Sequence, residues 1–161
     1  MTELNRLLQR LCEADVGFVI VGGFAAILHG SALLTRDLDV CAVLSAENLG
    51  KLRDVFRQLH PTHRFTPQRL SFLDSPEPGA ALKNLYLQTD LGPIDFLSSI
   101  TGVGDYEQVR AQSIEVELFG RRVRVISVDD LIRSKLALGR EKDQLTLKEL
   151  LAVVEKNKLR S

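Results

Sequence analysis

Asp37 and Asp39 stand one residue apart at the start of an apolar stretch, DLDVCAVL. Side chains at i and i+2 of a strand point to the same face of a sheet, so this spacing places two carboxylates side by side, with Leu38 and Val40 turned to the core. Two close carboxylates repel each other unless a cation lies between them. Magnesium suits such a pair because it accepts a few carboxylates and completes its octahedron with water and phosphate oxygens.

A third carboxylate strengthens the prediction of a metal site at this pair. A D-x-D arises by chance about 0.7 times in a chain with this aspartate content, so the spacing alone is a weak signal. Asp95, however, interrupts the apolar run PIDFL between Ile94 and Phe96. A carboxylate among apolar neighbours is costly to bury unless a charge or a metal compensates it. On a strand beside the first pair, Asp95 would complete a site for two metal ions.

A glycine pair precedes these acids. Gly22 and Gly23 follow the apolar run FVIV and precede the small-residue segment FAAILHG, so we expect a turn between a strand and a helix. Backbone N–H groups at such a helix start favour anions. The pair lacks the G-x-G-x-x-G of a dinucleotide site and the G-K-[ST] of a P-loop, and Gly-Gly often only makes a turn. The order strand, glycine pair, helix, D-x-D and later strand-borne aspartate is more specific than any one part.

The elements that position these residues follow from periodicity and turn signals. Helices are expected over 2–14, 24–30, 46–59 (capped by Ser45), 128–138 and 146–156. Strands are expected over 18–21, 38–44, 82–89 and 94–99, in a hairpin on both sides of Phe119-Gly120, and at RLSFL within an otherwise loop-like stretch from 60 to 79. This order predicts a mixed α/β (α+β) fold, a single domain over residues 1–161 with a small mixed sheet, flanking helices and C-terminal helices from about 128.

Composition excludes several classes. The chain is 45% hydrophobic and 26% charged, with 21 basic and 21 acidic residues, which argues against a domain devoted to non-specific nucleic-acid binding but leaves room for a local basic patch. Cys12 and Cys41 are too few for a disulfide framework, so a reducing compartment is expected. We see neither a signal-peptide core nor a membrane-length apolar run, and therefore expect a cytoplasmic protein with no membrane partner.

The pattern resembles a known superfamily. The segments GGFA (22–25), HG (29–30) and TRDLD (35–39) are similar to the core of DNA polymerase beta-like nucleotidyltransferases, above all their small stand-alone bacterial members of abortive-infection and toxin–antitoxin systems. Asp95 matches that family's third carboxylate. Lys135 and the R-x-K-D at 140–143 match its C-terminal signature. The chain departs from the pattern at Leu33, where relatives often carry an arginine.

The resemblance implies a nucleotidyltransferase-like fold and transfer of a nucleoside monophosphate from an NTP to an acceptor hydroxyl of RNA, protein or a small molecule, with release of pyrophosphate. It implies catalytic, metal-binding carboxylates at Asp37, Asp39 and Asp95, holding two Mg²⁺ or Mn²⁺ ions, with Asp95 as a candidate general base. The residues that it implies for nucleotide and phosphate binding are Gly22, Gly23, Thr35, Arg36, Lys135, Arg140 and Lys142.

Alternatives remain open at this point. The same fold could serve as a catalytically inactive binding or antitoxin-type module with a partner protein encoded nearby. His29 could pack at a helix end or touch nucleotide. The alternating Arg121, Arg122 and Arg124 could be a solvated face or a contact for RNA or a partner.

Overall fold

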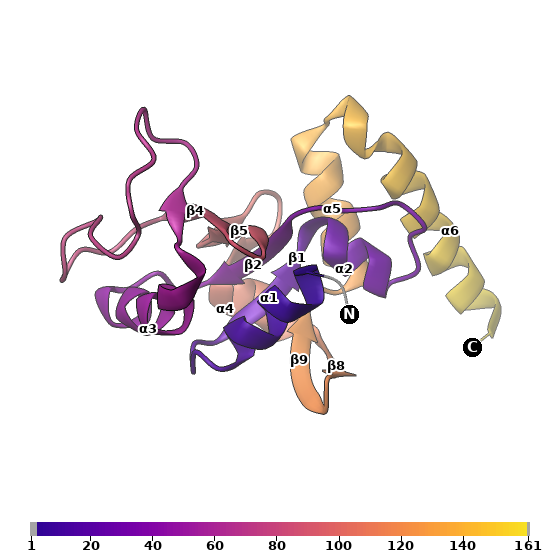
Figure 1. The fold of residues 1–161 in the computed structure, drawn as a ribbon. Helices are drawn as coiled ribbons and strands as arrows, with labels where there is room; N and C mark the ends of the chain where they lie inside the picture. The colour runs from indigo at the N-terminus through magenta and orange to yellow at the C-terminus, as the bar shows by residue number, and fades with distance from the viewer. Residues whose placement is uncertain (1–2, 161) are drawn as a thin grey trace.

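The computed structural model describes residues 3–160, which form a seven-stranded mixed sheet with flanking helices (Figure 1). The helices are α1 Glu3–Cys12, α2 Gly22–Leu28, α3 Ala46–Phe56, α4 Tyr106–Gln112, α5 Val128–Leu138 and α6 Gln144–Arg160, with short 3₁₀ turns η1 Arg57–Leu59 and η2 Glu141–Asp143. The strands are β1 Phe18–Val21, β2 Leu38–Ala42, β3 Thr62–His63, β4 Asn84–Thr89, β5 Gly92–Leu97, β6 Ser99–Ile100, β7 Gly104–Asp105, β8 Ile114–Leu118 and β9 Arg121–Val125.

The sheet has the strand order β3-β4-β5-β2-β1-β9-β8, and β6 pairs with β7 apart from it. β2 runs antiparallel to β1 but parallel to β5, and β1 runs parallel to β9. The outer pairs β4–β5 and β8–β9 are antiparallel hairpins. In Figure 1 the segment after α3 and the C-terminal helices α5 and α6 lie on opposite sides of the central strands. The mixed α/β fold class is therefore confirmed.

The central strands are apolar because both their faces are covered. In β2, Leu38 and Val40 are fully buried, as the alternation predicts, and α1 and α4 both contact this strand. Phe96 of β5 meets Phe56 of α3 with ring centroids 6.2 Å apart. The sheet's centre is thus fixed by packing on either side, and the polar residues at the ends of β1, β2 and β5 are held in place by that core.

Local differences from the expected elements are instructive. Gly22 and Gly23 begin α2 instead of forming a separate turn, and the helix ends at Leu28, before the predicted residue 30. The strand predicted at RLSFL is wrong, since only Ser71 makes a bridge there, opposite Thr62. Phe72 nevertheless explains the apolar signal, because its side chain is fully buried.

Helix α4 was not anticipated. Its seven residues are too few for a periodic signal, but Asp105 and Gln108 form a reciprocal capping box at its start. The last helix is longer than expected and reaches Arg160. Among the described residues, no helix is both long and apolar enough to cross a membrane.

The loop between η1 and β4 is packed onto the body by Phe72. Its ring lies 4.9 Å from the Arg53 guanidinium and meets the His63 ring edge-on at 5.8 Å. We expect Phe72→Ala to lower the free energy of unfolding by about 3–5 kcal/mol, because it empties a fully buried site. Phe65→Ala, at a ring that is 71% exposed, is the matched control and should cost less than about 1 kcal/mol. Equal losses in urea unfolding would contradict this packing.

Candidate active site

Two of the predicted carboxylates lie on adjacent strands at the same level. Asp39 of β2 is the direct partner of Asp95 of β5 in the parallel ladder, and of Val21 of β1 on its other side. Neighbouring strands lie about 4.8 Å apart, so the two carboxyl groups share one end of the sheet. Asp37 precedes β2 and is half-buried.

Burial and mutual repulsion make this pair electrostatically costly. Burial raises the pKa of Asp39 to about 7, and the neighbouring charges of Asp95 and Asp37 add to the effect. Burial also raises the pKa of Asp95, although the Arg64 guanidinium opposes this. The Oδ1 atom of Asp39 is buried and has no hydrogen-bond partner. An orphaned carboxylate oxygen beside a second carboxylate is a donor set suited to a hard divalent cation.

The glycine pair allows the helix α2 to start against these acids. A Cβ on Gly22, whose φ is 66°, would lie 2.3 Å from Asp39 Oδ2. A Cβ on Gly23 would lie 2.8 Å from Thr35 Oγ1. The N-cap residue is Val21, whose side chain has no hydrogen-bond acceptor, so no N-cap side chain caps the first N–H groups of α2. Any larger residue would push the helix away from the carboxylates.

Two clefts meet at the Asp39–Asp95 pair. The first, of about 410 Å³, is lined by Gly22, Gly23, Ala26, Ser31, Leu33, Leu34, Thr35, Asp37, Asp39, Asp95, Lys135, Arg140, Lys142, Asp143 and Thr146. The second, of about 440 Å³, is lined by Val21, Gly22, Asp39, Asn84, Tyr86, Asp95, Leu97, Ser99, Ile100, Thr101, Leu131, Ser134, Lys135, Leu138 and Arg140. Both clefts therefore share the carboxylate pair and two cations from the C-terminal part of the chain. We call the first the glycine cleft and the second the tyrosine cleft.

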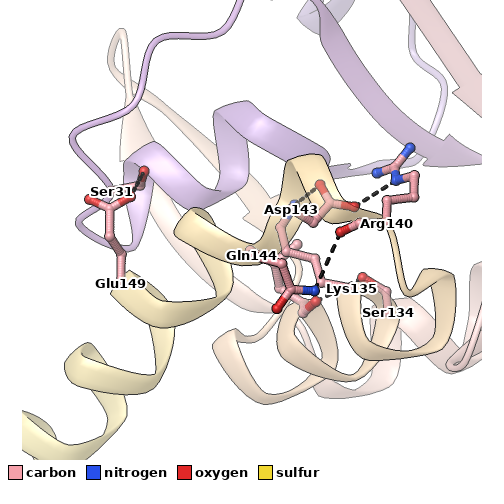
Figure 2. Close-up of polar contacts among 8 residues, drawn as sticks. Ser31, Ser134, Lys135, Arg140, Asp143, Gln144 and Glu149 are labelled. Atoms are coloured by element: carbon pink, nitrogen blue, oxygen red, sulfur yellow. Dashed lines mark hydrogen bonds and ion pairs between the residues drawn. The ribbon is translucent and has the colours of Figure 1, made fainter.

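Those two cations are held by one buried acid (Figure 2). Lys135 Nζ of α5 donates to Asp143 Oδ1 at 3.2 Å, and Arg140 Nε donates to Asp143 Oδ2 at 2.6 Å. Burial acts to raise the pKa of Asp143, but the hydrogen bonds from Arg140 and Lys135 outweigh it and hold the pKa below its usual value. Lys135 is 7% exposed, so this ion pair fixes a charged amine inside the wall of both clefts.

The loop that carries Leu33 and Thr35 is tied to α6, as Figure 2 also shows. Glu149 accepts hydrogen bonds from Ser31 Oγ and from the backbone N–H of Ala32, both at 2.9 Å. Thr35 Oγ1 in turn donates to the Asp37 carbonyl at 3.2 Å. The C-terminal helix therefore helps to shape the glycine cleft.

The structure brings together nearly all the residues that the sequence singled out. Every predicted site residue lines one or both clefts except Arg36, whose side chain is exposed outside them. Leu33 lines the glycine cleft. Among residues 3–160, no three His, Cys, Asp or Glu side chains lie together as a ready-made metal group, and Asp37 lines the glycine cleft beside the pair, where its charge helps to raise the pKa of Asp39.

Sequence reasoning missed three contributors. Arg64, in the loop after β3, pairs with Asp95 Oδ1 and donates to the Leu87 carbonyl at 3.3 Å. No local pattern marks it, because its place depends on how the loop folds. Asn84 and Tyr86 could have been predicted, since they alternate with buried leucines on β4. Tyr86 is the ladder partner of Asp95.

The histidines have other partners. His29 Nε2 donates to the Ile126 carbonyl at 2.7 Å, which supports the packing interpretation. His60 Nδ1 lies 2.7 Å from Asp90 Oδ2, and His63 Nε2 donates to the Ser75 carbonyl at 2.6 Å. His60 and His63, three residues apart, thus contact different groups.

Comparison with known proteins connects this geometry to a family. A family described as "Nucleotidyltransferase of unknown function (DUF6036)" matches residues 1–161. No curated protein gives a sequence match.

Solved structures show the same fold at low identity. The lincosamide antibiotic adenylyltransferase LnuA, bound to lincomycin, superposes with a TM-score of 0.59 at 17% identity, covering 94% of this chain and 96% of that one. A protein from Thermotoga maritima assigned as a nucleotidyltransferase (TM1012) gives 0.54 at 18% identity, covering 92% and 90%. ANT(2″)-Ia in complex with adenylyl-2″-tobramycin gives 0.52 at 14% identity, covering 94% and 98%. The predicted nucleotidyltransferase-like fold is therefore confirmed.

The raised pKa of Asp39 predicts how stability depends on pH. Its ordinary value is 3.8 and its folded value about 7, so the folded chain binds this proton more tightly than the unfolded chain. This tighter proton binding stabilises the folded chain below about pH 4, and the stabilisation is lost as the pH rises to about 7. Asp39→Asn cannot lose this stabilisation. We therefore expect its free energy of unfolding, measured in urea with EDTA, to rise by about 2 kcal/mol relative to that of wild type as the pH increases from about 5 to about 8. Asp74→Asn, at an exposed aspartate, is the control, and parallel pH profiles for Asp39→Asn and wild type would contradict the prediction.

Arg64 supplies part of the positive charge that the acidic pair requires. We expect Arg64→Gln to make the protein more dependent on a divalent cation, because the cation must then offset the whole charge of Asp95. The rise in Tm on adding Mg²⁺ should exceed that of wild type by about 3 °C, which corresponds to about 1 kcal/mol for a chain of this size. Arg57→Gln, at an exposed arginine, should behave as wild type in the same thermal scan. A smaller Mg²⁺ effect in Arg64→Gln would show that Arg64 assists the cation instead of standing in for it.

Proposed function

The chain belongs to the DUF6036 family of nucleotidyltransferases, and we propose that it moves a nucleoside monophosphate from ATP or another NTP to an acceptor hydroxyl, with release of pyrophosphate. The observation that carries the proposal is the half-buried Asp39–Asp95 pair, side by side in the ladder with one buried, unpartnered oxygen, where two clefts meet. We further propose that residues 1–161 act as one domain. The cytoplasmic location stays a prediction from the sequence.

The donor set fits magnesium or manganese. Asp39 and Asp95 offer carboxylate oxygens only, which are hard ligands, and Asp37 adds negative charge close by. We propose that these three residues hold the two ions that the family resemblance implies, with water and substrate phosphate oxygens as the remaining ligands. Bound there, such ions would stabilise charge on the attacking and leaving oxygens.

The glycine cleft is the proposed site of the triphosphate. Gly22 and Gly23 leave the start of α2 open to an anion, and Thr35 stands against them. The cations proposed to meet the phosphates are Lys135, Arg140 and Lys142. Lys135 and Arg140 are already fixed by Asp143, so little side-chain entropy is lost when a phosphate binds. For Arg36 we propose contact only with a ligand that extends beyond the cleft.

The tyrosine cleft is the proposed site of the acceptor. Asp95 lies at its junction with the glycine cleft, and its raised pKa makes it a better base for the proton of an acceptor hydroxyl. LnuA and ANT(2″)-Ia were solved with lincomycin and adenylyl-2″-tobramycin. Within residues 3–160, the cleft lining carries Lys135 and Arg140 and no carboxylate besides the pair, which disfavours a polycationic acceptor. RNA, a protein side chain or an uncharged small molecule fits better, and we include among the proposed partners a protein encoded nearby.

The test is transfer of label from each NTP, with Mg²⁺ or Mn²⁺, to cell RNA, protein and small-molecule fractions. We expect transfer by wild type and a loss of about a thousandfold or more in Asp39→Asn and Asp95→Asn, because the charge stabilisation lost is several kcal/mol. Asp74→Asn should retain full transfer.

Two results would count against the proposal. Activity that persists in both Asp39→Asn and Asp95→Asn would place the site elsewhere. No transfer to any fraction, together with no metal-dependent thermal shift on adding NTP, would favour the non-catalytic binding or antitoxin-type module.

A further inference from the structure

A third cleft, of about 520 Å³, lies at the end of the sheet opposite the carboxylate pair. It is formed where β1 begins, whereas Gly22 and Asp39 lie where β1 ends. Its walls come from the turn between α1 and β1, from α4 and from β9. The residues that line it are Cys12, Val16, Gly17, Phe18, Tyr106, Arg110, Arg121, Arg122, Val123 and Arg124. We call it the arginine cleft.

The lining carries four guanidinium groups and, among the residues described, no carboxylate. Basic and acidic residues are equal in number over the whole chain, so this is a local separation of charge. Arginine stays protonated at all physiological pH values, so the positive charge is permanent. Burial raises the pKa of the Tyr106 phenol and of the Cys12 thiol, and the positive charges of Arg110 and Arg124 near the phenol and of Arg121 near the thiol oppose this rise. The four arginines thus line one space together with these two groups.

Neighbouring acids neutralise only part of this charge. Glu115, on β8 outside the lining, receives Arg124 at 3.0 Å and Arg122 at 3.6 Å. Glu13 and Glu107 also lie outside the lining, and their negative charges raise the pKa of Cys12 and of Tyr106, respectively. Arg122 is 85% exposed and Arg110 is also exposed, so both can reorient toward a ligand.

The remaining lining is largely apolar and includes two aromatic rings. Tyr106 lies across the start of β1, since a side chain at Gly17 would meet its hydroxyl at 2.5 Å. Phe18 and Val16 extend the same surface. Guanidinium forks recognise phosphate bidentately, and an aromatic ring supports a planar base, so the two together suit a nucleotide.

We propose that the arginine cleft binds the phosphate of a nucleotide, either free or at the end of an RNA strand, as a site separate from the carboxylate pair. The role proposed for this cleft is binding, through the four guanidinium groups of its lining. The proposal does not depend on the reaction proposed above.

The experiment uses Cys12 as a local reporter, because it lines the cleft and is half-buried, whereas Cys41 is fully buried on β2. The rate of iodoacetamide alkylation at Cys12, located by peptide mass, is measured with inorganic phosphate, AMP or a short single-stranded RNA. Equilibrium dialysis gives the affinity for each probe. EDTA is present throughout, to weaken nucleotide binding at the carboxylate pair.

The variant Arg110→Gln/Arg122→Gln removes two exposed cleft charges. The control Arg6→Gln/Arg57→Gln removes two exposed arginines elsewhere, each beside an acid three residues away, and changes net charge equally. We expect AMP to slow Cys12 alkylation in wild type and in the control. In the cleft variant we expect affinity to fall by about tenfold or more and the protection to be lost.

The remaining outcomes are equally decisive. Binding and Cys12 protection by RNA but not by AMP, lost in the cleft variant, would support the RNA end as the source of the phosphate. Binding that neither protects Cys12 nor responds to the cleft variant would overturn the proposal. Failure of all three probes would also overturn it, even if the arginines prove to contact another protein.

Discussion

The repulsion between Asp39 and Asp95 is the constraint on which the site depends. The ladder places the two residues directly opposite each other on parallel strands, and the core below them prevents either strand from shifting. The chain accordingly surrounds the pair with compensating features: an arginine from a distant loop, two glycines that leave space, and a wall of cations anchored through Asp143.

The C-terminal helices help to position the groups around the Asp39–Asp95 pair, as the core does. Lys135 comes from α5 and Arg140 from the turn after it, and both are oriented by one buried acid. Glu149 of α6 holds the loop that leads into β2. Residues more than a hundred positions apart thus set the shape of one cleft, which is why a helix at the end of the chain belongs to the site and not only to its support.

Much of this arrangement was predictable from the sequence. The central strands, the D-x-D spacing and the odd aspartate in PIDFL are local signals with a clear physical cause, and the structure has Asp39 and Asp95 as ladder partners. Arg64 and Glu149 were not predictable, because their contacts depend on loop folding and helix docking over long sequence separations. The strand predicted at RLSFL is wrong because the apolar pattern there reflects the burial of the Phe72 side chain and not a strand. The roles of the site residues, as distinct from their positions, stay predictions.

The Arg64–Asp95 ion pair also bears on how the protein is made. Many small metalloproteins remain unfolded until their ion arrives, because the ligands repel one another without it. Here a side chain of the same polypeptide supplies a counter-charge to one of the two acids, so the newly synthesised chain can complete its sheet before any cation is at hand. For the ions proposed above, assembly and loading would then be separate events, and a shortage of divalent ions would leave the cell with a pool of folded, unloaded protein instead of a pool of misfolded chains.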